Sequence, residues 1–317
     1  NKSAGATLNN EPSLSNIIVM AVFLVQKNMF RRFSTLLQGN RLFSRTPTTS
    51  EDELVLVDHQ EEITLIGINR PEKRNCVNTP TAEALLKAFK NFNEDPSSKV
   101  AVLYGVGGNF CAGFDLGQVA SSTELPPSIA AFESGPMGPS RYMSHKPVIA
   151  AVEGFAVAGG LELALWCDMR VVEDTALMGV YCRRFGVPLI DGGTVRLPAI
   201  VGFGRAMDMI LTGRAVSGKE AFEWGLSNRI VACGTAIGQA VNLAGCLLKF
   251  PQECMRADRQ SAYYATYSAS SLQDALRFEH ENGLPIIQKE SVVGANRFVD
   301  GIGRHGKFNI DPIKNKL

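Results

Sequence analysis

Short apolar runs separated by polar turns dominate residues 54–157, and their spacing switches between the strand and the helix period. "LVLVDHQ" (54–60) and "EITLIGINR" (62–70) alternate apolar and polar residues, which predicts two strands joined by a tight turn. "TPTAEALLKAFKNFNED" (79–95) has helical spacing behind a threonine cap and predicts a helix. "VAVLYGVGG" (100–108) and "KPVIAAVEGFAV" (146–157) each predict one buried strand, and a helix is expected after each of them.

The order of these elements predicts an α/β fold. Strands that alternate with helices need crossover connections, so the sheet should be largely parallel. From residue 195 onward the pattern is helical, interrupted by one short strand, "NRIVA" (228–232). We therefore expect an α/β core over residues 51–250 and a helical carboxy-terminal region over 251–317. An amino-terminal extension over 1–50 should lie outside the fold.

The amino-terminal extension has the composition of a mitochondrial transit peptide. "MFRRFSTLLQGNRLFSR" (29–45) is rich in Arg and Ser, and no acidic residue lies between Glu11 and Glu51. A basic disordered tail is the alternative. The apolar run "NIIVMAVFLV" (16–25) is too short to span a bilayer. The composition therefore predicts a mitochondrial matrix protein without a membrane span.

Overall composition is that of a globular enzyme. Of the 317 residues, 45% are hydrophobic and 20% charged, and the net charge is +1. This near-neutral charge gives no electrostatic case for nucleic acid as a partner. The seven cysteines are scattered, form no C-x-x-C pair and have no histidine at metal-ligand spacing. We expect reduced thiols and no bound metal.

Two glycine-containing turns carry the candidate chemistry. Gly159 and Gly160 follow the strand within 146–157, and Glu162 lies in the first turn of the helix expected next. Glycines at such a junction let backbone N–H groups face a ligand. "GGNFCAGFDL" (107–116) follows the preceding strand in the same way, so the two turns could aim two donors at one oxygen and form an oxyanion hole.

Glu162 itself has two explanations. The helix dipole favours a charged acid in the first turn, whereas burial raises its pKa, and that balance suits a general base. An acid that only complements the helix dipole is the alternative.

Five ordered segments resemble the crotonase superfamily of enoyl-CoA hydratases and isomerases. They are "NRPEKRNCVN" (69–78), "GGNFCAGFDL", "KPVIAAVEGFAVAGGLELALWCDMRV" (146–171), "FGVPLIDGGTVRLPAIVG" (185–202) and "AMDMILTGRAVSGKEAFEWGLSNRIV" (206–231). The resemblance covers about residues 52–306. It implies a spiral of ββα units with a helical carboxy-terminal region, assembled as a homotrimer or a dimer of trimers.

The resemblance also implies an acyl-CoA thioester as the ligand. Its carbonyl oxygen would accept hydrogen bonds from the N–H groups of Ala112 and Gly159. The loops that carry Arg74, Cys76, Gly113, Phe114 and Asp115 would border the substrate, with Lys73 or Arg74 available to a phosphate. No separate cofactor is expected, because CoA is part of the substrate.

The sequence departs from the hydratase pattern at one position. Hydratases of this superfamily use two glutamates: Glu162 matches the one that activates water, and Cys182 occupies the position of the other. A thiol is mostly protonated at neutral pH and holds a water poorly. Asp191 is a candidate replacement, because isomerases of the superfamily carry an aspartate at a similar place. As Asp is a preferred helix cap, Asp191 could instead cap the helix beginning at "GTVRL".

These features predict an enoyl-CoA hydratase-like lyase acting on 2-enoyl-CoA thioesters in fatty-acid or branched-chain catabolism. Glu162 and Asp191 would be the catalytic carboxylates. A double-bond isomerase with the same residues is the first alternative. The second is an acyl-CoA-binding protein that has lost catalysis.

Overall fold

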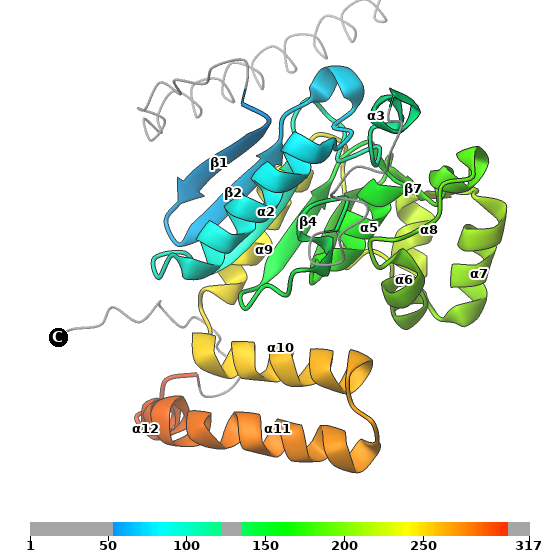
Figure 1. Cartoon of the computed structure of the whole chain (residues 1–317). Helices are drawn as coiled ribbons and strands as arrows, with labels where there is room; N and C mark the ends of the chain where they lie inside the picture. Colours follow the sequence, from blue (N-terminus) through cyan, green and yellow to red (C-terminus); the bar gives the residue numbers. More distant parts are fainter. Residues whose placement is uncertain (1–52, 122–134, 304–317) are drawn as a thin grey trace, which may run out of the picture. The chain divides into compact units, whose positions relative to one another are not determined.

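A six-stranded sheet forms the centre of the fold in a computed structural model of the chain, in which residues 53–121 and 135–303 are described (Figure 1). The predicted transit peptide lies outside the described residues. In spatial order the strands are β1 (Val55–Gln60), β2 (Ile63–Ile68), β3 (Val100–Gly105), β4 (Val148–Val152), β6 (Met169–Glu173) and β9 (Arg229–Val231). β1 and β2 are antiparallel, and all other neighbouring pairs are parallel, which confirms the largely parallel sheet.

A second sheet of three strands adjoins the site described below. It contains β5 (Phe155–Val157), β7 (Leu177–Gly179) and β8 (Ala215–Ser217). The prediction of one strand over 146–157 is therefore wrong, because the segment divides into β4 and β5. Gly154 turns the chain between them with φ 52°, a value that favours glycine. β4 thus belongs to the six-stranded sheet, and β5 belongs to the three-stranded sheet.

The helices cover both faces of the central sheet and form a separate carboxy-terminal layer. Those around the sheets are α2 (Thr79–Glu94), α3 (Leu116–Ser121), α5 (Gly159–Trp166), α6 (Gly193–Val201), α7 (Phe203–Thr212), α8 (Gly218–Glu223) and α9 (Ala236–Leu247). The carboxy-terminal layer contains α10 (Gln252–Tyr267), α11 (Leu272–Ile286) and α12 (Val292–Val299). The cap of α2 is Asn78, whose side chain accepts the Thr81 N–H at 3.1 Å, so the predicted threonine cap is one residue off.

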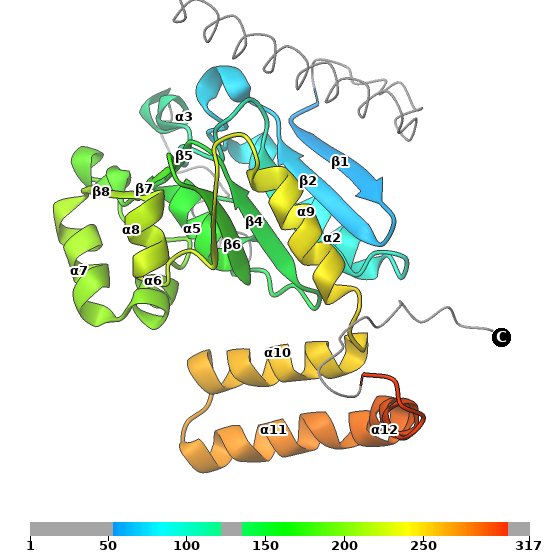
Figure 2. The same cartoon turned by 180° about the vertical axis from the view of Figure 1, so that it is seen from behind.

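The two faces of the sheet carry different hydrophobic clusters, as the alternation of side chains along a strand requires. Leu103 of β3 packs with α2 and α5, whereas Val102 packs with the alanines of α9 on the opposite face. Figure 2 shows α9 lying along that face. The sheet is therefore buried on both sides, and the strand ends and turns are left to form a site.

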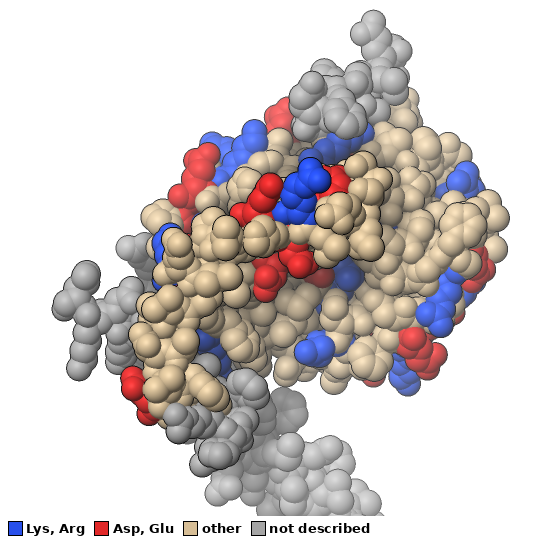
Figure 3. Space-filling view, turned by 90° about the horizontal axis from the view of Figure 1, so that it is seen from below, with Lys and Arg blue, Asp and Glu red and all other residues tan. Residues whose placement is uncertain are grey.

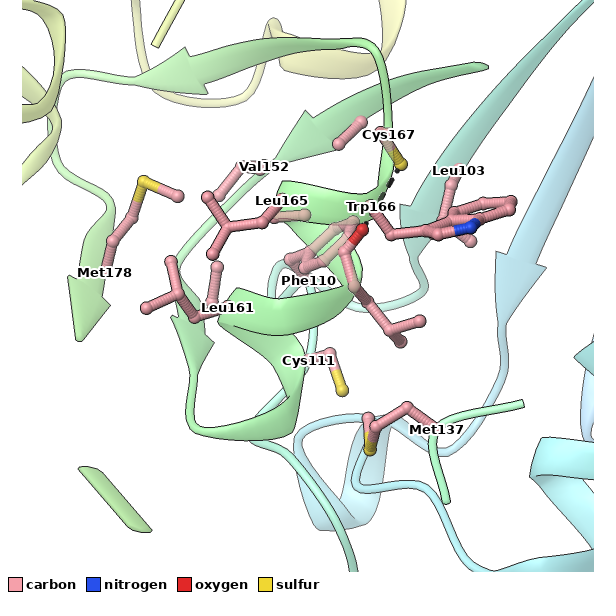
Figure 4. Close-up of a cluster of buried hydrophobic side chains, with 14 of the residues drawn as sticks. Leu103, Phe110, Cys111, Met137, Val152, Leu161, Leu165, Trp166, Cys167 and Met178 are labelled. Carbon is pink, nitrogen blue, oxygen red and sulfur yellow. Dashed lines mark hydrogen bonds between the residues drawn. The ribbon is translucent and has the colours of Figure 1, made fainter. Parts of the chain in front are cut away.

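Helix α5 is buried along its whole length (Figure 4). Leu161, Leu165 and Trp166 point into the core, and the Cys167 thiol that follows the helix donates to the Leu163 carbonyl at 3.4 Å. A helix that is apolar on all sides must lie inside a core. Its one acidic residue, Glu162, is consequently held in fixed surroundings.

The carboxy-terminal helices attach to the core through Asp168, directly after α5. Its carboxylate accepts the Arg259 Nε–H at 2.7 Å and the Tyr263 hydroxyl at 2.9 Å, both from α10. Figure 3 looks onto the side on which α11 and α12 lie, and much of that face consists of uncharged residues. The exposed apolar side chains on this outer layer are Leu272, Leu276, Leu284, Ile287, Val292, Val293, Phe298 and Val299.

All seven cysteines are free thiols, as predicted. Among residues 53–121 and 135–303, no helix is long and apolar enough to cross a membrane.

We predict that Gly160→Ala strongly destabilises the protein, whereas Gly245→Ala does not. A Cβ on Gly160 would lie 2.0 Å from the Cys111 carbonyl oxygen, so the backbone must move. A Cβ on Gly245 in α9 would meet nothing within 4 Å. Urea unfolding should show a loss of about 2 kcal/mol or more for Gly160→Ala. Gly245→Ala should be unchanged or up to about 1 kcal/mol more stable. Equal effects would contradict the close packing assigned to Gly160.

Candidate functional site

A cavity of about 240 Å³ lies beside the amino-terminal end of α5. It contains both predicted carboxylates and both predicted oxyanion turns. Its lining is mostly apolar, as expected of a site for an aliphatic chain. The lining residues are Arg74, Ala112, Phe114, Leu116, Val119, Pro136, Phe155, Val157, Ala158, Gly159, Glu162, Tyr181, Cys182, Phe185, Val187, Pro188, Ile190 and Asp191.

Glu162 is a buried acid whose carboxylate is held by backbone N–H groups at the start of α6 and in the loop just before it. Its side chain is 3% exposed, and Oε1 accepts the N–H groups of Asp191 at 2.9 Å and Gly193 at 2.8 Å. Burial, and then the charge of Asp191, raise the pKa of Glu162 to about 7, against the lowering effect of these hydrogen bonds. Oε2 accepts no hydrogen bond from the described residues and is left for a ligand.

Asp191 lines the same cavity and does not cap α6. The cap position is Gly192, and no side chain caps that helix. Instead, Asp191 Oδ1 accepts the Met137 N–H at 3.1 Å and a short hydrogen bond from the Ser140 hydroxyl. Burial raises the pKa of Asp191 above its usual value. The hydrogen bonds from Ser140 and Met137, and then the charges of Arg141 and Arg196, act in the opposite direction. The structure therefore contradicts the helix cap, and a catalytic role for Asp191 stays a prediction.

Glycines allow the chain to approach both carboxyl groups. A Cβ on Gly193 would lie 2.9 Å from Glu162 Oε1, and a Cβ on Gly135 would lie 2.6 Å from Asp191 Oδ1. Real Cβ atoms essentially never come this close, so a larger residue at either position would displace the acid. The positions of the two acids thus depend on glycines from two segments that are far apart in sequence.

The two turns meet, but one of the two predicted oxyanion donors is wrong. The Ala112 N–H donates to the Arg74 carbonyl at 3.0 Å and is not available to a ligand. Two residues later, Phe114 lies opposite Val77 in a parallel bridge. The Val77 N–H donates to the Gly113 carbonyl, and the Val77 carbonyl accepts the Asp115 N–H, so Val77 bonds the two neighbours of Phe114 and not Phe114 itself.

The Phe114 N–H therefore points away from Val77. Within the described residues neither it nor the Gly159 N–H has an acceptor. A Cβ on Gly113 would lie 3.1 Å from the Gly159 nitrogen, so the two turns are adjacent. The pair of donors is thus Phe114 and Gly159.

The predicted CoA-bordering residues divide into two groups. Arg74 and Phe114 line the cavity, and the Arg74 guanidinium lies 5.2 Å from the centre of the Phe155 ring. Cys76, Gly113 and Asp115 do not line it. The Asp115 carboxylate instead pairs with Arg70 at 3.0 Å and with Lys73 at 3.2 Å. These ion pairs connect the loop of Asp115 to the segment that contains Arg70 and Lys73.

Cys182 lines the cavity, in the position where the resemblance implies a second glutamate. Burial, followed by the nearby charge of Glu162, raises the pKa of its thiol. The thiol is accordingly neutral at physiological pH and is not a proton acceptor for water.

Three residues around the Asp191 loop were not singled out by the sequence. Met137, Ser140 and Arg196 surround the Asp191 loop, but Ser140 is 51 residues from Asp191 in sequence, and "GPMGPSR" (135–141) matches no motif. Arg196 donates to the Asp191 carbonyl at 2.9 Å and to the Ser140 carbonyl at 2.7 Å. Long-range contacts of this kind cannot be inferred from local spacing. In the described ranges, no cluster of three or more His, Cys, Asp or Glu side chains is arranged to hold a metal ion.

Known proteins with similar sequences include hydratases and dehydratases of CoA thioesters. An enoyl-CoA hydratase of Mycobacterium tuberculosis is 35% identical over 196 residues, which are 60% of this chain and 72% of that protein. A mevalonyl-coenzyme A hydratase of Aspergillus fumigatus is 31% identical over 208 residues, 66% of this chain and 77% of that protein. A carnitinyl-CoA dehydratase of Proteus mirabilis is 36% identical over 182 residues, with coverages of 56% and 68%.

Solved structures with the same fold give a consistent result. The crystal structure of an enoyl-CoA hydratase from Mycobacterium tuberculosis H37Rv superposes with a TM-score of 0.72 at 31% identity, covering 78% of this chain and 96% of that one. That of an enoyl-CoA hydratase from Bacillus anthracis has a TM-score of 0.71 at 27% identity, with the same coverages. The enoyl-CoA hydratase/isomerase family matches residues 58–302. Together with the crotonase fold of these neighbours, this match shows that the chain belongs to the enoyl-CoA hydratase/isomerase family, within the crotonase superfamily.

Proposed function

We propose that this chain catalyses the reversible addition of water to a 2-enoyl-CoA thioester. One observation carries the proposal: two buried carboxylates face one apolar cavity, and each has one oxygen fixed by protein donors. Glu162 Oε1 and Asp191 Oδ1 are held by N–H and O–H groups. Oε2 and Oδ2 accept no hydrogen bond from the described residues and are available to a water molecule.

The thioester carbonyl would lie between the Phe114 and Gly159 N–H groups. During reaction this oxygen becomes the negatively charged oxygen of an enolate, and both donors are in place before the charge develops. Loss of one such donor costs about 3 to 4 kcal/mol in comparable sites. The thioester itself accepts the electrons, so the proposed reaction uses no separate cofactor.

The carboxylates would divide the proton transfers. Water adds its oxygen to C3 and gives a proton to one carboxylate, while the C2–C3 double-bond electrons move to the enolate oxygen. The other carboxyl group then gives its proton to C2, and the thioester carbonyl re-forms. The pair therefore needs one ionised and one protonated member, which two carboxyl groups in one cavity provide.

The apolar lining favours an aliphatic acyl chain, in agreement with fatty-acid or branched-chain substrates. The names of the relatives support water addition or removal over double-bond isomerisation. We keep the mitochondrial matrix as a proposal, which rests on the composition of residues 29–45.

We predict that Glu162→Gln abolishes turnover and retains substrate binding, because the amide keeps the shape and loses the proton transfer. Loss of absorbance of the conjugated enoyl thioester in crotonyl-CoA measures turnover, and titration calorimetry with CoA measures binding. Asp191→Asn should also eliminate hydration.

The remaining outcomes of this assay separate the alternatives. A constant crotonyl-CoA signal with turnover of 3-enoyl- or dienoyl-CoA would indicate an isomerase. Binding without turnover of any of these substrates would leave the non-catalytic alternative. Unchanged hydration in Glu162→Gln would remove Glu162 from the mechanism.

We predict that Glu162→Gln gains stability relative to the wild type as pH rises from 5 to 8. The folded-state pKa of Glu162 is raised from 4.5 to about 7, so its ionisation favours the unfolded chain across this window. The neutral amide removes that penalty. Urea unfolding should show a relative gain of roughly 2 kcal/mol between the two pH values. A constant difference between wild type and variant would mean that Glu162 ionises normally.

We propose a homotrimer or a dimer of trimers, supported by the apolar side chains on α11 and α12. Exposed apolar patches of this kind commonly mark protein interfaces. Sedimentation velocity should show a trimer or hexamer, and the double variant Leu276→Glu, Val293→Glu should shift it toward the monomer. A monomeric wild type at micromolar concentration would contradict the proposal.

A further inference from the structure

The Asp191 carboxylate has a donor of a different kind from those of Glu162. Glu162 Oε1 is held by two backbone N–H groups. Asp191 Oδ1 is held by one backbone N–H, from Met137, and by the Ser140 hydroxyl. Among the hydrogen bonds of the described residues, Ser140 is the one side-chain donor to either carboxylate of the pair. Its side chain is 1% exposed, so no solvent competes for the hydroxyl.

The Arg196 side chain and the close approach of Gly135 fix Ser140 in that position. The Arg196 guanidinium bridges the two loops, with Nη1 donating to the Asp191 carbonyl at 2.9 Å and Nη2 to the Ser140 carbonyl at 2.7 Å. A Cβ on Gly135 would lie 1.8 Å from the Ser140 oxygen, so the loop has room only for glycine there. The hydroxyl is therefore directed at the carboxylate by a rigid frame.

The hydrogen bond has an electrostatic consequence. Two carboxyl groups that share a cavity do not both ionise at once, and donors decide which ionises first. A hydroxyl that donates to a carboxylate favours its charged form. The charge on Asp191 is the second cause, after burial, that raises the pKa of Glu162.

We propose that Ser140 is a positioning residue that keeps Asp191 the ionised member of the pair and leaves the proton on Glu162. This assignment rests on the proposed hydration. It makes Asp191 the group that accepts the water proton as oxygen bonds to C3. Glu162 then gives its proton to C2, which reverses the part that the resemblance implies for Glu162.

The pH dependence of kcat/KM for crotonyl-CoA tests the proposal. In the wild type, kcat/KM should fall above about pH 7, where Glu162 loses its proton. The acid limb should report Asp191. In Ser140→Ala the acid limb should move upward by about one pH unit. Ser140→Cys, with a weaker donor, should fall between the two.

A matched control is Ser144→Ala. Ser144 is also buried, and its hydroxyl donates to the Lys146 carbonyl at 2.7 Å, away from the acid pair. The acid limb of this variant should stay at its wild-type position. A loss of kcat/KM in Ser140→Ala that is equal at every pH would overturn the proposal. A wild-type kcat/KM that rises through pH 7 to a plateau would also overturn it.

A stability measurement separates failure of the proposal from failure of the proposed function. Ser140→Ala should be destabilised more at neutral than at acid pH, because the lost donor matters most when Asp191 is ionised. Urea unfolding at several pH values needs no turnover. If the wild type hydrates no enoyl-CoA and this pH-dependent difference is present, the proposed function fails and the electrostatic role of Ser140 stands. A difference that is constant with pH would remove that role.

Discussion

Two carboxyl groups buried in one apolar cavity set the constraint that the surrounding structure has to meet. Burying an unpaired charge in an apolar cavity costs free energy, and two like charges in the same cavity also repel each other. The chain supplies no salt bridge to either carboxylate within the described residues. It supplies polar hydrogens instead: three backbone N–H groups and the Ser140 hydroxyl. One oxygen of each carboxyl group is thereby fixed, and the other accepts no hydrogen bond from the described residues.

The arrangement of donors explains one unusual feature of the backbone. Ala158 has φ 54° and ψ −126°, an unusual conformation for a residue with a side chain, and it directly precedes Gly159. Strain of this kind costs of order 1 to 3 kcal/mol and tends to occur at functional sites. Here it turns β5 into α5 so that the Gly159 N–H faces the cavity. The buried core around α5 holds the turn in place.

Much of this arrangement could be predicted from the sequence, and the failures have physical reasons. The glycine turn, Glu162 and the parallel sheet follow from local patterns, which the sequence contains directly. Whether a backbone N–H is free to bind a ligand depends on whether a carbonyl group of another segment accepts it in the folded chain. The prediction of Ala112 as a donor failed because the Arg74 carbonyl accepts the Ala112 N–H. Asp191 could not be told from a cap without knowing that Ser140 reaches it from another loop.

The same electrostatic constraint gives a reason for the thiol at Cys182. With Asp191 already beside Glu162, a glutamate at position 182 would bring a third carboxyl group into the cavity. At most one of the three would ionise readily, since burial and mutual repulsion raise each pKa. A buried thiol adds volume to the lining and, with its pKa raised, adds no charge. Cys182 and Asp191 therefore complement each other: Asp191 brings the second carboxyl group to the cavity from its own loop, and Cys182 fills part of the lining with a neutral side chain.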